Sequence, residues 1–183
     1  MARKEVGEAL LEFFEQSGKL KEERRRGWVK KLGMKNPESV ADHSYRTALM
    51  AMVISDMRGL DSGRAMRLAL LHDLPESVVG DSTPDERSGK AKSSLETRAM
   101  EDIVRELPKE LGELYLGAWR EYLEGKTEEA RLVRQLDKLE MAIQGWEYSR
   151  SRRDPSETRE FWTSARSHIT DRGLLALLGR VEP

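Results

Sequence analysis

Residues 68–76 read LALLHDLPE. This apolar run breaks at His72-Asp73, and 29 positions before His72 another histidine, His43, follows an aspartate. A further acid, Asp137, lies 64 positions after Asp73. A single His-Asp dipeptide is weak evidence for any activity, because short patterns recur by chance. The interpretation therefore depends on where each of these residues falls on its predicted element.

The length and charge of the chain limit what it can be. Its 183 residues suit one compact domain with a sizeable core. We expect that domain over residues 1–183, with a metal-site core at about 36–150 and C-terminal helices at 155–180 packed on it. The 36% of charged residues nearly cancel, to a formal net charge of −1. We therefore expect neither nucleic acid nor an anionic membrane surface as a partner.

The chain contains no cysteine. This excludes disulfides, thiolate zinc sites and cysteine nucleophiles, and it suits an intracellular protein. No apolar run approaches the length of about 18 residues that a membrane-spanning helix needs. We therefore predict a soluble, cytoplasmic protein without a membrane segment.

Apolar residues recur with helical rather than alternating spacing in nearly every segment, and Gly, Pro, Asn and Ser cluster at the breaks. The predicted fold class is all-α, a compact multi-helix bundle. Irregular segments are expected at about 19–38, which contains the basic connector Lys19–Lys31, and at about 79–93. The expected helices cover about 4–17, 40–58, 62–74, 93–107, 108–125 and 127–148, with one or two shorter helices after them.

Polar residues interrupt the apolar faces of three predicted helices. His43 shares a helical stripe with Val40, and His72-Asp73 falls in the last turns of the third helix. Asp137 has apolar residues four positions before and after it, so it lies on or beside a buried stripe. A buried carboxylate needs a salt bridge, hydrogen bonds or a metal to offset its lost hydration.

One metal ion would explain these interruptions together. If the helices pack around a common centre, two imidazoles and two carboxylates converge, from His43, His72, Asp73 and Asp137. Such a mixed set suits a divalent ion such as Co, Mn, Fe or Zn, and Mg is a further candidate. The alternative is that each residue is a hydrogen-bonded core residue or a helix cap.

Several stretches also match a known family in order and spacing. Residues 37–43 (PESVADH), 68–76 with Gly80-Asp81 after them, and 133–137 (VRQLD) resemble the small HD-domain metal-dependent phosphohydrolases, specifically the 5′-deoxynucleotidases. The resemblance extends over about residues 8–150. It implies a homodimer and a compact helical bundle of the HD type. The metal ligands that it implies are His43, His72, Asp73 and Asp137.

The resemblance implies hydrolysis of deoxyribonucleoside 5′-monophosphates to the deoxyribonucleoside and phosphate. A divalent ion suits this reaction, because it lowers the pKa of bound water and polarises a phosphoryl oxygen. The catalytic residues that the resemblance implies are Asp73, Glu76 and Asp81. Glu76 lies four positions after His72 and would shuttle a proton or, near Asp81, help to hold a second, weaker metal. Pro75 departs from the family, which commonly has a helix-compatible residue there.

The expected substrate-binding residues fall in two segments. Lys19–Lys31 carries seven basic residues against two acidic ones. The family's Arg-x-Gly-Trp arrangement matches Arg25, with Arg26 as the alternative, and Trp28. Arginine suits a phosphate because its fork can bond two oxygens at once. The second segment resembles the family's substrate loop, with expected contacts from Asp81, Ser82, Thr83 and Pro84.

The sequence leaves other functions open. The same scaffold could serve another HD-type nucleotide phosphohydrolase, acting on triphosphates, cyclic dinucleotides or other phosphate esters. The basic segment with Trp28 also suits a non-catalytic nucleotide- or RNA-binding protein with a structural metal. A further hypothesis is a helical bundle that binds no metal and whose inward polar groups pair with one another. Candidate interface residues lie around Trp119, Tyr122 and the C-terminal helices, and His168 is expected on the surface.

Overall fold

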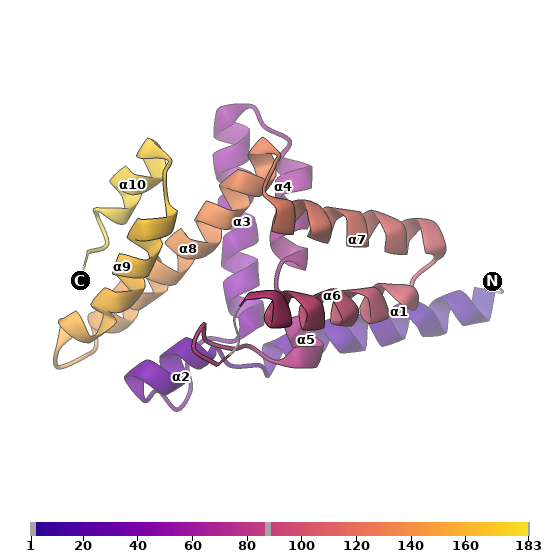
Figure 1. The fold of residues 1–183 in the computed structure, drawn as a ribbon, viewed down its shortest axis with the longest axis horizontal. Helices are drawn as coiled ribbons and strands as arrows, with labels where there is room; N and C mark the ends of the chain where they lie inside the picture. The colour runs from indigo at the N-terminus through magenta and orange to yellow at the C-terminus, as the bar shows by residue number, and fades with distance from the viewer. Residues whose placement is uncertain (1–2, 87–88, 183) are drawn as a thin grey trace. The chain divides into compact units, whose positions relative to one another are not determined.

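The structure is a computed structural model that describes residues 3–86 and 89–182 (Figure 1). Within these ranges the chain forms helices and no β-strand, and Arg24 and Ser39 make one isolated antiparallel bridge. The all-α prediction is confirmed. The chain divides into two compact units: a first unit of Met1–Tyr45 with Leu70–Leu123, and a second unit of Arg46–Ala69 with Glu124–Pro183. One domain over residues 1–183 stays a prediction.

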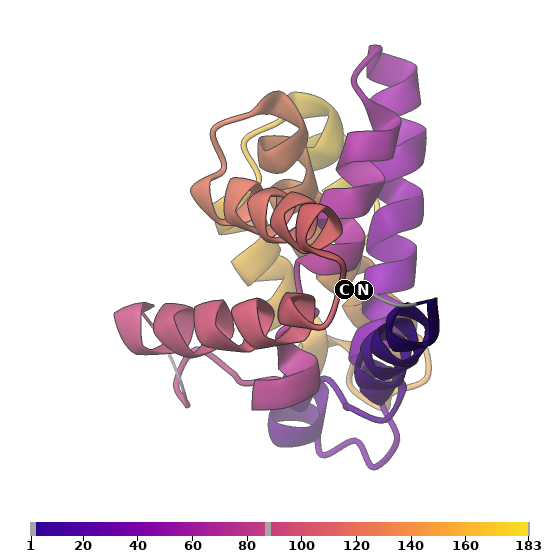
Figure 2. The same cartoon turned by 90° about the vertical axis from the view of Figure 1, so that its right-hand side faces the viewer.

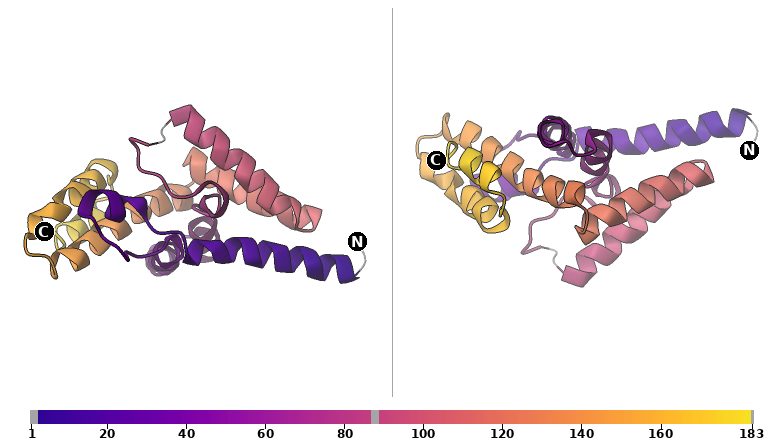
Figure 3. Two further views of the ribbon diagram at one scale, coloured as in Figure 1. Left: turned by 90° about the horizontal axis from the view of Figure 1, so that it is seen from below. Right: turned by 90° about the horizontal axis from the view of Figure 1, so that it is seen from above.

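The first unit carries most of the predicted site residues. It contains the beginning of α3 (Val40–Arg58) and the end of α4 (Ser62–Leu71). Its other helices are α1 (Arg3–Gly18), η1 (Lys19–Lys21), α2 (Arg26–Leu32), α5 (Glu76–Val79), α6 (Gly89–Arg105) and α7 (Lys109–Glu124). Figure 3 shows α1 as one straight helix with the N-terminus at its far end.

A compact apolar cluster holds this unit together. Its buried members are Leu20, Val40, Leu71, Leu74, Met100, Ile103, Val104 and Trp119. The helices α6 and α7 run antiparallel around the turn at Pro108 (Figure 2). They approach closely at Gly112, because a Cβ atom there would lie 2.7 Å from the carbonyl oxygen of Val104. A larger residue at Gly112 would therefore push α7 away from α6.

Three boundaries differ from the sequence prediction, and one of them is the end of the third predicted helix, which lies at Leu71 rather than near residue 74. The predicted connector Lys19–Lys31 contains η1 and α2, because Trp28 and Leu32 bury apolar surface and Gly33 ends α2 at a left-handed φ of 63°. The fourth predicted helix begins at Gly89 rather than near residue 93. Its first turns include the i,i+4 ion pair of Lys92 with Glu96, which favours helix there.

The second unit is built around α8 (Glu128–Ser149). Thr127 caps α8 by accepting a hydrogen bond from the amide of Ala130 at 3.2 Å, as its position predicts. The short helices η2 (Pro155–Thr158), α9 (Arg159–His168) and α10 (Arg172–Leu178) follow and pack on α8. His168 is exposed, as expected. Among the described residues, no helix combines the length and the apolar character that crossing a membrane requires.

Candidate metal centre

Three predicted ligands converge in the first unit. His43 Nε2 and His72 Nε2 lie 3.3 Å apart, and His72 Nε2 lies 3.1 Å from Asp73 Oδ2. The third side of this triangle, from His43 Nε2 to Asp73 Oδ2, is 3.7 Å. Both histidines are buried. His43 and the adjacent pair His72-Asp73, which begins 29 positions later, thus bring their donor atoms to one place.

Local sequence explains why His43 points inward. Ser39 donates hydrogen bonds from its amide and its hydroxyl to Asp42 Oδ2, both at 2.8 Å, and the amide of Asp42 donates to Ser39 Oγ at 3.1 Å. This reciprocal capping box starts α3 and lowers the pKa of Asp42. Asp42 is therefore occupied as a cap, and the next residue, His43, falls on the buried side of the first turn.

His72 and Asp73 lie in the turn that follows α4. The helix ends at Leu71, and Pro75 stands at the beginning of α5, where its missing N–H costs no hydrogen bond. Trp119 Nε1 donates to the carbonyl oxygen of His72 at 3.2 Å, and the rings of Tyr122 and His72 meet edge-on at 5.3 Å. Trp119 is 1% exposed, so of the two possibilities that the sequence leaves for it, core or interface, the structure shows the core.

The electrostatics of Asp73 and Glu76 differ. Burial would raise the pKa of Asp73, but His72, His43 and Arg25 hold that pKa below its usual range. Burial raises the pKa of Glu76, and the neighbouring carboxylates of Asp73 and Asp81 raise it further. Among the described side chains, Glu76 has a buried Oε2 atom with no hydrogen-bond partner. The centre therefore combines an ionised carboxylate with one that burial disfavours as an anion.

The donor set fits a divalent metal ion. An ion held at about 2.1 Å by each donor would separate neighbouring donors by about 3.0 to 3.4 Å, in octahedral or tetrahedral geometry. The observed distances of 3.1, 3.3 and 3.7 Å need only small adjustment to reach this range. Two imidazole nitrogens and one carboxylate oxygen could therefore hold such an ion.

Arg25 lies beside this centre and Arg26 does not. Arg25 Nη1 is 3.5 Å from Asp73 Oδ2, whereas the guanidinium of Arg26 is paired with Glu86. Of the two candidate arginines, the structure thus brings Arg25 to Asp73, and the contact of Arg25 with a phosphate stays a prediction. Trp28 is buried at 1% exposure, and its Nε1 donates to Glu38 Oε1 at 2.8 Å. The proposed contact of Trp28 with a nucleotide stays a prediction.

The predicted substrate loop begins at Gly80, where φ is 74°. Asp81 accepts hydrogen bonds from the amide of Arg26 at Oδ2 and from the amide of Ser82 at Oδ1, both at 2.7 Å. The amide of Asp81 donates to Glu23 Oε1 at 3.0 Å. Ser82, Thr83 and Pro84 continue this loop. Sequence reasoning missed Glu23, because nothing in its spacing distinguishes it from a solvated acid.

Asp137 belongs to the second unit. It lies on α8 with 7% exposure, and Lys138 Nζ is 3.0 Å from its Oδ2. Its burial agrees with the prediction that this acid falls on an apolar face. Its assignment as the fourth metal ligand stays a prediction.

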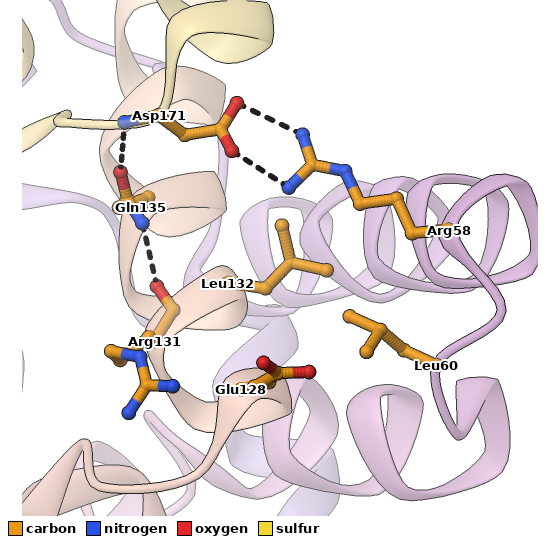
Figure 4. Close-up of a pocket in the computed structure, with 7 residues that line it drawn as sticks. All are labelled: Arg58, Leu60, Glu128, Arg131, Leu132, Gln135 and Asp171. Atoms are coloured by element: carbon orange, nitrogen blue, oxygen red, sulfur yellow. Dashed lines mark hydrogen bonds and ion pairs between the residues drawn. The ribbon is translucent and has the colours of Figure 1, made fainter.

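The second unit also contains a cavity of about 350 Å³, lined by Arg58, Leu60, Glu128, Arg131, Leu132, Gln135 and Asp171 (Figure 4). There Arg58 bonds both carboxylate oxygens of Asp171, and Gln135 Oε1 accepts a hydrogen bond from the amide of Asp171. These polar groups bond one another, and none of the predicted site residues is among the lining side chains. We therefore assign this cavity no part in the centre.

Similarity to known proteins agrees with this geometry. Residues 17–176 match the family model of the HD domain. The chain is 38% identical over 177 residues to 5′-deoxynucleotidase HDDC2 of Mus musculus, an alignment that covers 96% of this chain and 88% of that one. It is 43% identical over 148 residues to 5′-deoxynucleotidase HDDC2 of Dictyostelium discoideum, covering 76% and 77% of the two chains.

A solved structure shares the fold as well. A conserved hypothetical protein from Pyrococcus furiosus superposes with a TM-score of 0.75 and 31% sequence identity, covering 93% of this chain and 98% of that one. The chain therefore belongs to the HD-domain family. Within that family its relatives include the 5′-deoxynucleotidases of mouse and Dictyostelium.

Proposed function

We propose that this chain is a metal-dependent 5′-deoxynucleotidase, which hydrolyses deoxyribonucleoside 5′-monophosphates to the deoxyribonucleoside and phosphate. The observation that carries the proposal is the triangle of donor atoms from His43, His72 and Asp73, in which both histidines are buried. The names of the relatives at 38% and 43% identity support the substrate class. The expected metal is Co, Mn, Fe or Zn, with Mg as a further candidate.

The metal would be held by His43, His72 and Asp73, with Asp137 proposed as the fourth ligand. When bound, it would supply Lewis acidity to a phosphoryl oxygen and lower the pKa of a water molecule. Arg25, which the structure places beside Asp73, would bind the phosphate through its two-pronged guanidinium. The phosphate would then be fixed for attack by water.

Glu76 would donate a proton to the oxygen atom of the leaving nucleoside. Breaking the bond between phosphorus and O5′ leaves an oxygen that needs a proton. The raised pKa of Glu76 suits a carboxyl that holds a proton at Oε2 and delivers it there. The competing role for Glu76 is in a second, weaker metal site near Asp81. The two bonded oxygens of Asp81 favour a positioning role for that residue instead.

Phosphate release tests the proposal. The purified chain should release phosphate from a panel of deoxy and ribo 5′-monophosphates when Co, Mn, Mg or Zn is added, with deoxy substrates preferred. Triphosphates and cyclic dinucleotides in the same panel test the broader phosphohydrolase alternative. Salt-sensitive binding to single-stranded RNA without any phosphate release would favour the non-catalytic alternative.

Asp137 has a test of its own. Asp137→Ala should abolish most of the phosphate release and lower the metal content after dialysis, if Asp137 is a ligand. Asp154→Ala is the matched control, because Asp154 is an exposed carboxylate of the same unit that caps η2. Equal activity of wild type and Asp137→Ala would show that the fourth ligand is wrong.

We further propose a cytoplasmic homodimer. On α3, Leu49, Val53 and Met57 are exposed and spaced four residues apart, so they form one apolar ridge on the second unit's part of that helix. A second copy would cover this ridge. In sedimentation experiments, the wild type should be a dimer and Val53→Glu should be a monomer. A monomeric wild type would contradict the dimer.

Fractionation of cells that express the full chain tests the proposed cytoplasmic location.

A further inference from the structure

Two segments of the first unit are joined by charged side chains. They are α2 and the loop of residues 80–86, which we call the substrate loop. Arg26 Nη2 lies 2.7 Å from Glu86 Oε1, and Arg26 Nε donates to Glu86 Oε2 at 3.1 Å. Lys30 Nζ lies 2.5 Å from Asp85 Oδ2. The first of these is a two-pronged pair, the geometry in which an arginine loses least freedom for each bond that it makes.

Glu86 also organises the loop internally. Its Oε2 accepts hydrogen bonds from the amide of Thr83 at 3.1 Å and from the hydroxyl of Thr83 at 3.0 Å. One carboxylate thus receives the fork of Arg26 and closes the turn at Thr83. The bond to Arg26 lowers the pKa of Glu86 to about 2, so Glu86 is ionised at neutral pH. The pair is therefore charged under any condition in which the enzyme would work.

The substrate loop also bonds the backbone next to Arg25, the residue that we propose binds the phosphate. The amide of Arg26 donates to Asp81 Oδ2 at 2.7 Å, so the loop also holds the first residue of α2 through its backbone. The preceding residue is Arg25, whose Nη1 lies 3.5 Å from Asp73 Oδ2. Any movement of the loop away from α2 would therefore release the backbone next to Arg25.

We propose that Arg26 and Glu86 are positioning residues, which latch the substrate loop to α2 and thereby hold Arg25 ready for the substrate's phosphate. The inference rests on the proposed function for the role of Arg25, and on the contacts of Arg26 with Glu86 and Asp81 for the latch. It also explains the two adjacent arginines: Arg25 faces the centre, and Arg26 faces the loop. The latch residues would touch neither the metal nor the substrate.

Amide hydrogen exchange tests the latch without any activity. In Arg26→Gln and in Glu86→Gln, the amides of Asp81 and Thr83 should exchange about 5-fold faster, because an exposed ion pair contributes modestly to closing a loop. Glu86→Gln keeps an oxygen that can still accept from Thr83, so it removes mainly the charge. The matched control is Arg120→Gln, since Arg120 is 54% exposed, Arg26 is 53% exposed, and Arg120 pairs with Glu101 at 2.9 Å. This control should leave both amides unchanged.

Kinetics test the purpose of the latch. With deoxyadenosine 5′-monophosphate and saturating metal, Arg26→Gln should raise KM about 5-fold and change kcat less than about 2-fold, because binding is disturbed and the chemistry is not. Arg26→Lys should recover part of the loss, and the double variant with Glu86→Gln should be no worse than either single variant.

The outcomes separate the two proposals. Unchanged exchange in both latch variants, or a change equal to that of Arg120→Gln, overturns the latch. Faster exchange with an unchanged KM overturns the link to Arg25. A fall in kcat at constant KM would place Arg26 in the chemistry and overturn its positioning role. If the wild type releases no phosphate while both variants exchange faster, the proposed function fails and the latch stands.

Discussion

Each unit contains a charged cluster with one buried carboxylate, and that carboxylate is paired differently in the two clusters. In the second unit, Arg46 of α3 meets Glu140, Gln144 and Glu147 of α8, a set that we call the Arg46 group. In the first unit, the His43 group consists of His43, His72, Asp73 and Glu76. Both contain a carboxylate that is almost inaccessible to solvent.

The Arg46 group satisfies its own charges. Arg46 Nε donates to Glu140 Oε1 at 2.8 Å, Nη1 bonds both oxygens of Glu147 at 2.8 Å, and Nη2 reaches Gln144 Oε1 at 2.6 Å. The three acceptors lie one or two turns apart along one face of α8. A guanidinium with this many acceptors has little left to offer a ligand.

The His43 group is not satisfied in the same way. Its two carboxylates raise the cost of each other's charge, and the buried Oε2 atom of Glu76 has no hydrogen-bond partner among the residues that the structure describes. Burying polar groups so incompletely costs free energy that a purely structural cluster would avoid. Burial of a charged group therefore does not by itself indicate a functional site. Incomplete pairing of a buried charged group does indicate one.

Removing a donor of the His43 group should have the largest effect. Asp73→Asn keeps the volume of the side chain and removes its charge, so we expect kcat/KM for deoxynucleoside 5′-monophosphates to fall about 1,000-fold, about 4 kcal/mol in transition-state stabilisation. Phosphate release and elemental analysis after dialysis measure the loss. Asp102→Asn, at an exposed carboxylate paired with Arg105, is the control. Full activity in Asp73→Asn would refute the metal assignment.

Breaking the Arg46 group should have the next largest effect, on stability. Arg46→Met removes the cation that pairs with the buried carboxylate of Glu140, so we expect the free energy of unfolding to fall by about 3 kcal/mol. Urea unfolding followed by circular dichroism measures the change. The double variant with Glu140→Leu removes both charges and should recover most of the loss. A single variant as stable as the wild type would mean that the pair contributes nothing.

Replacing Glu76 should change the free energy of unfolding in the opposite direction to replacing Arg46. Glu76→Gln removes a buried carboxylate with an unpartnered oxygen, so in the presence of a chelator the free energy of unfolding should rise by about 1 kcal/mol. Phosphate release with metal should fall at the same time. The same urea experiment compares this variant with Arg46→Met. Loss of stability in both variants would remove the distinction between the two groups.

The smallest effect is expected at a paired but more exposed acid of the second unit. Arg58 and the amide of Leu174 lower the pKa of Asp171 below its usual value of 3.8. The stabilisation is therefore present above that value and is lost as the pH falls through the lower pKa of the folded protein. Asp171→Asn should cost about 0.5 kcal/mol at pH 7, and the difference from wild type should shrink as the pH falls below 3.8. A constant difference across pH 2–7 would assign the loss to packing.

Much of the fold follows from local sequence. Thr127 predicts the start of α8 because a threonine oxygen can satisfy an amide that the helix leaves unpaired, and the structure shows that bond. Pro75 predicts the end of the helix before it, because it has no amide to donate. Local sequence does not predict the helix α2. Its charged residues indicate a solvated connector, and only the structure shows that Trp28 is buried.

The site is predictable only in part. His43, His72 and Asp73 stand out because each interrupts an apolar stripe, which is a property of one helix at a time. Glu23, Glu38 and Glu86 carry no such mark, because each lies in a polar segment and acquires its role from a partner elsewhere in the chain. The pairing of Arg46 with Glu140, 94 positions away, is hidden for the same reason.

The sequence by itself determined the helical class, the start of α8 at Thr127 and the residues that could supply metal-binding chemistry. These depend on periodicity and on backbone groups within a few residues of each other. Only the tertiary structure decided which donors meet at 3.1 to 3.7 Å, which of two adjacent arginines faces the centre, and which buried carboxylate oxygen of the described residues has no hydrogen-bond partner. Those outcomes depend on contacts between segments that are far apart in the chain, and no local pattern encodes such distances.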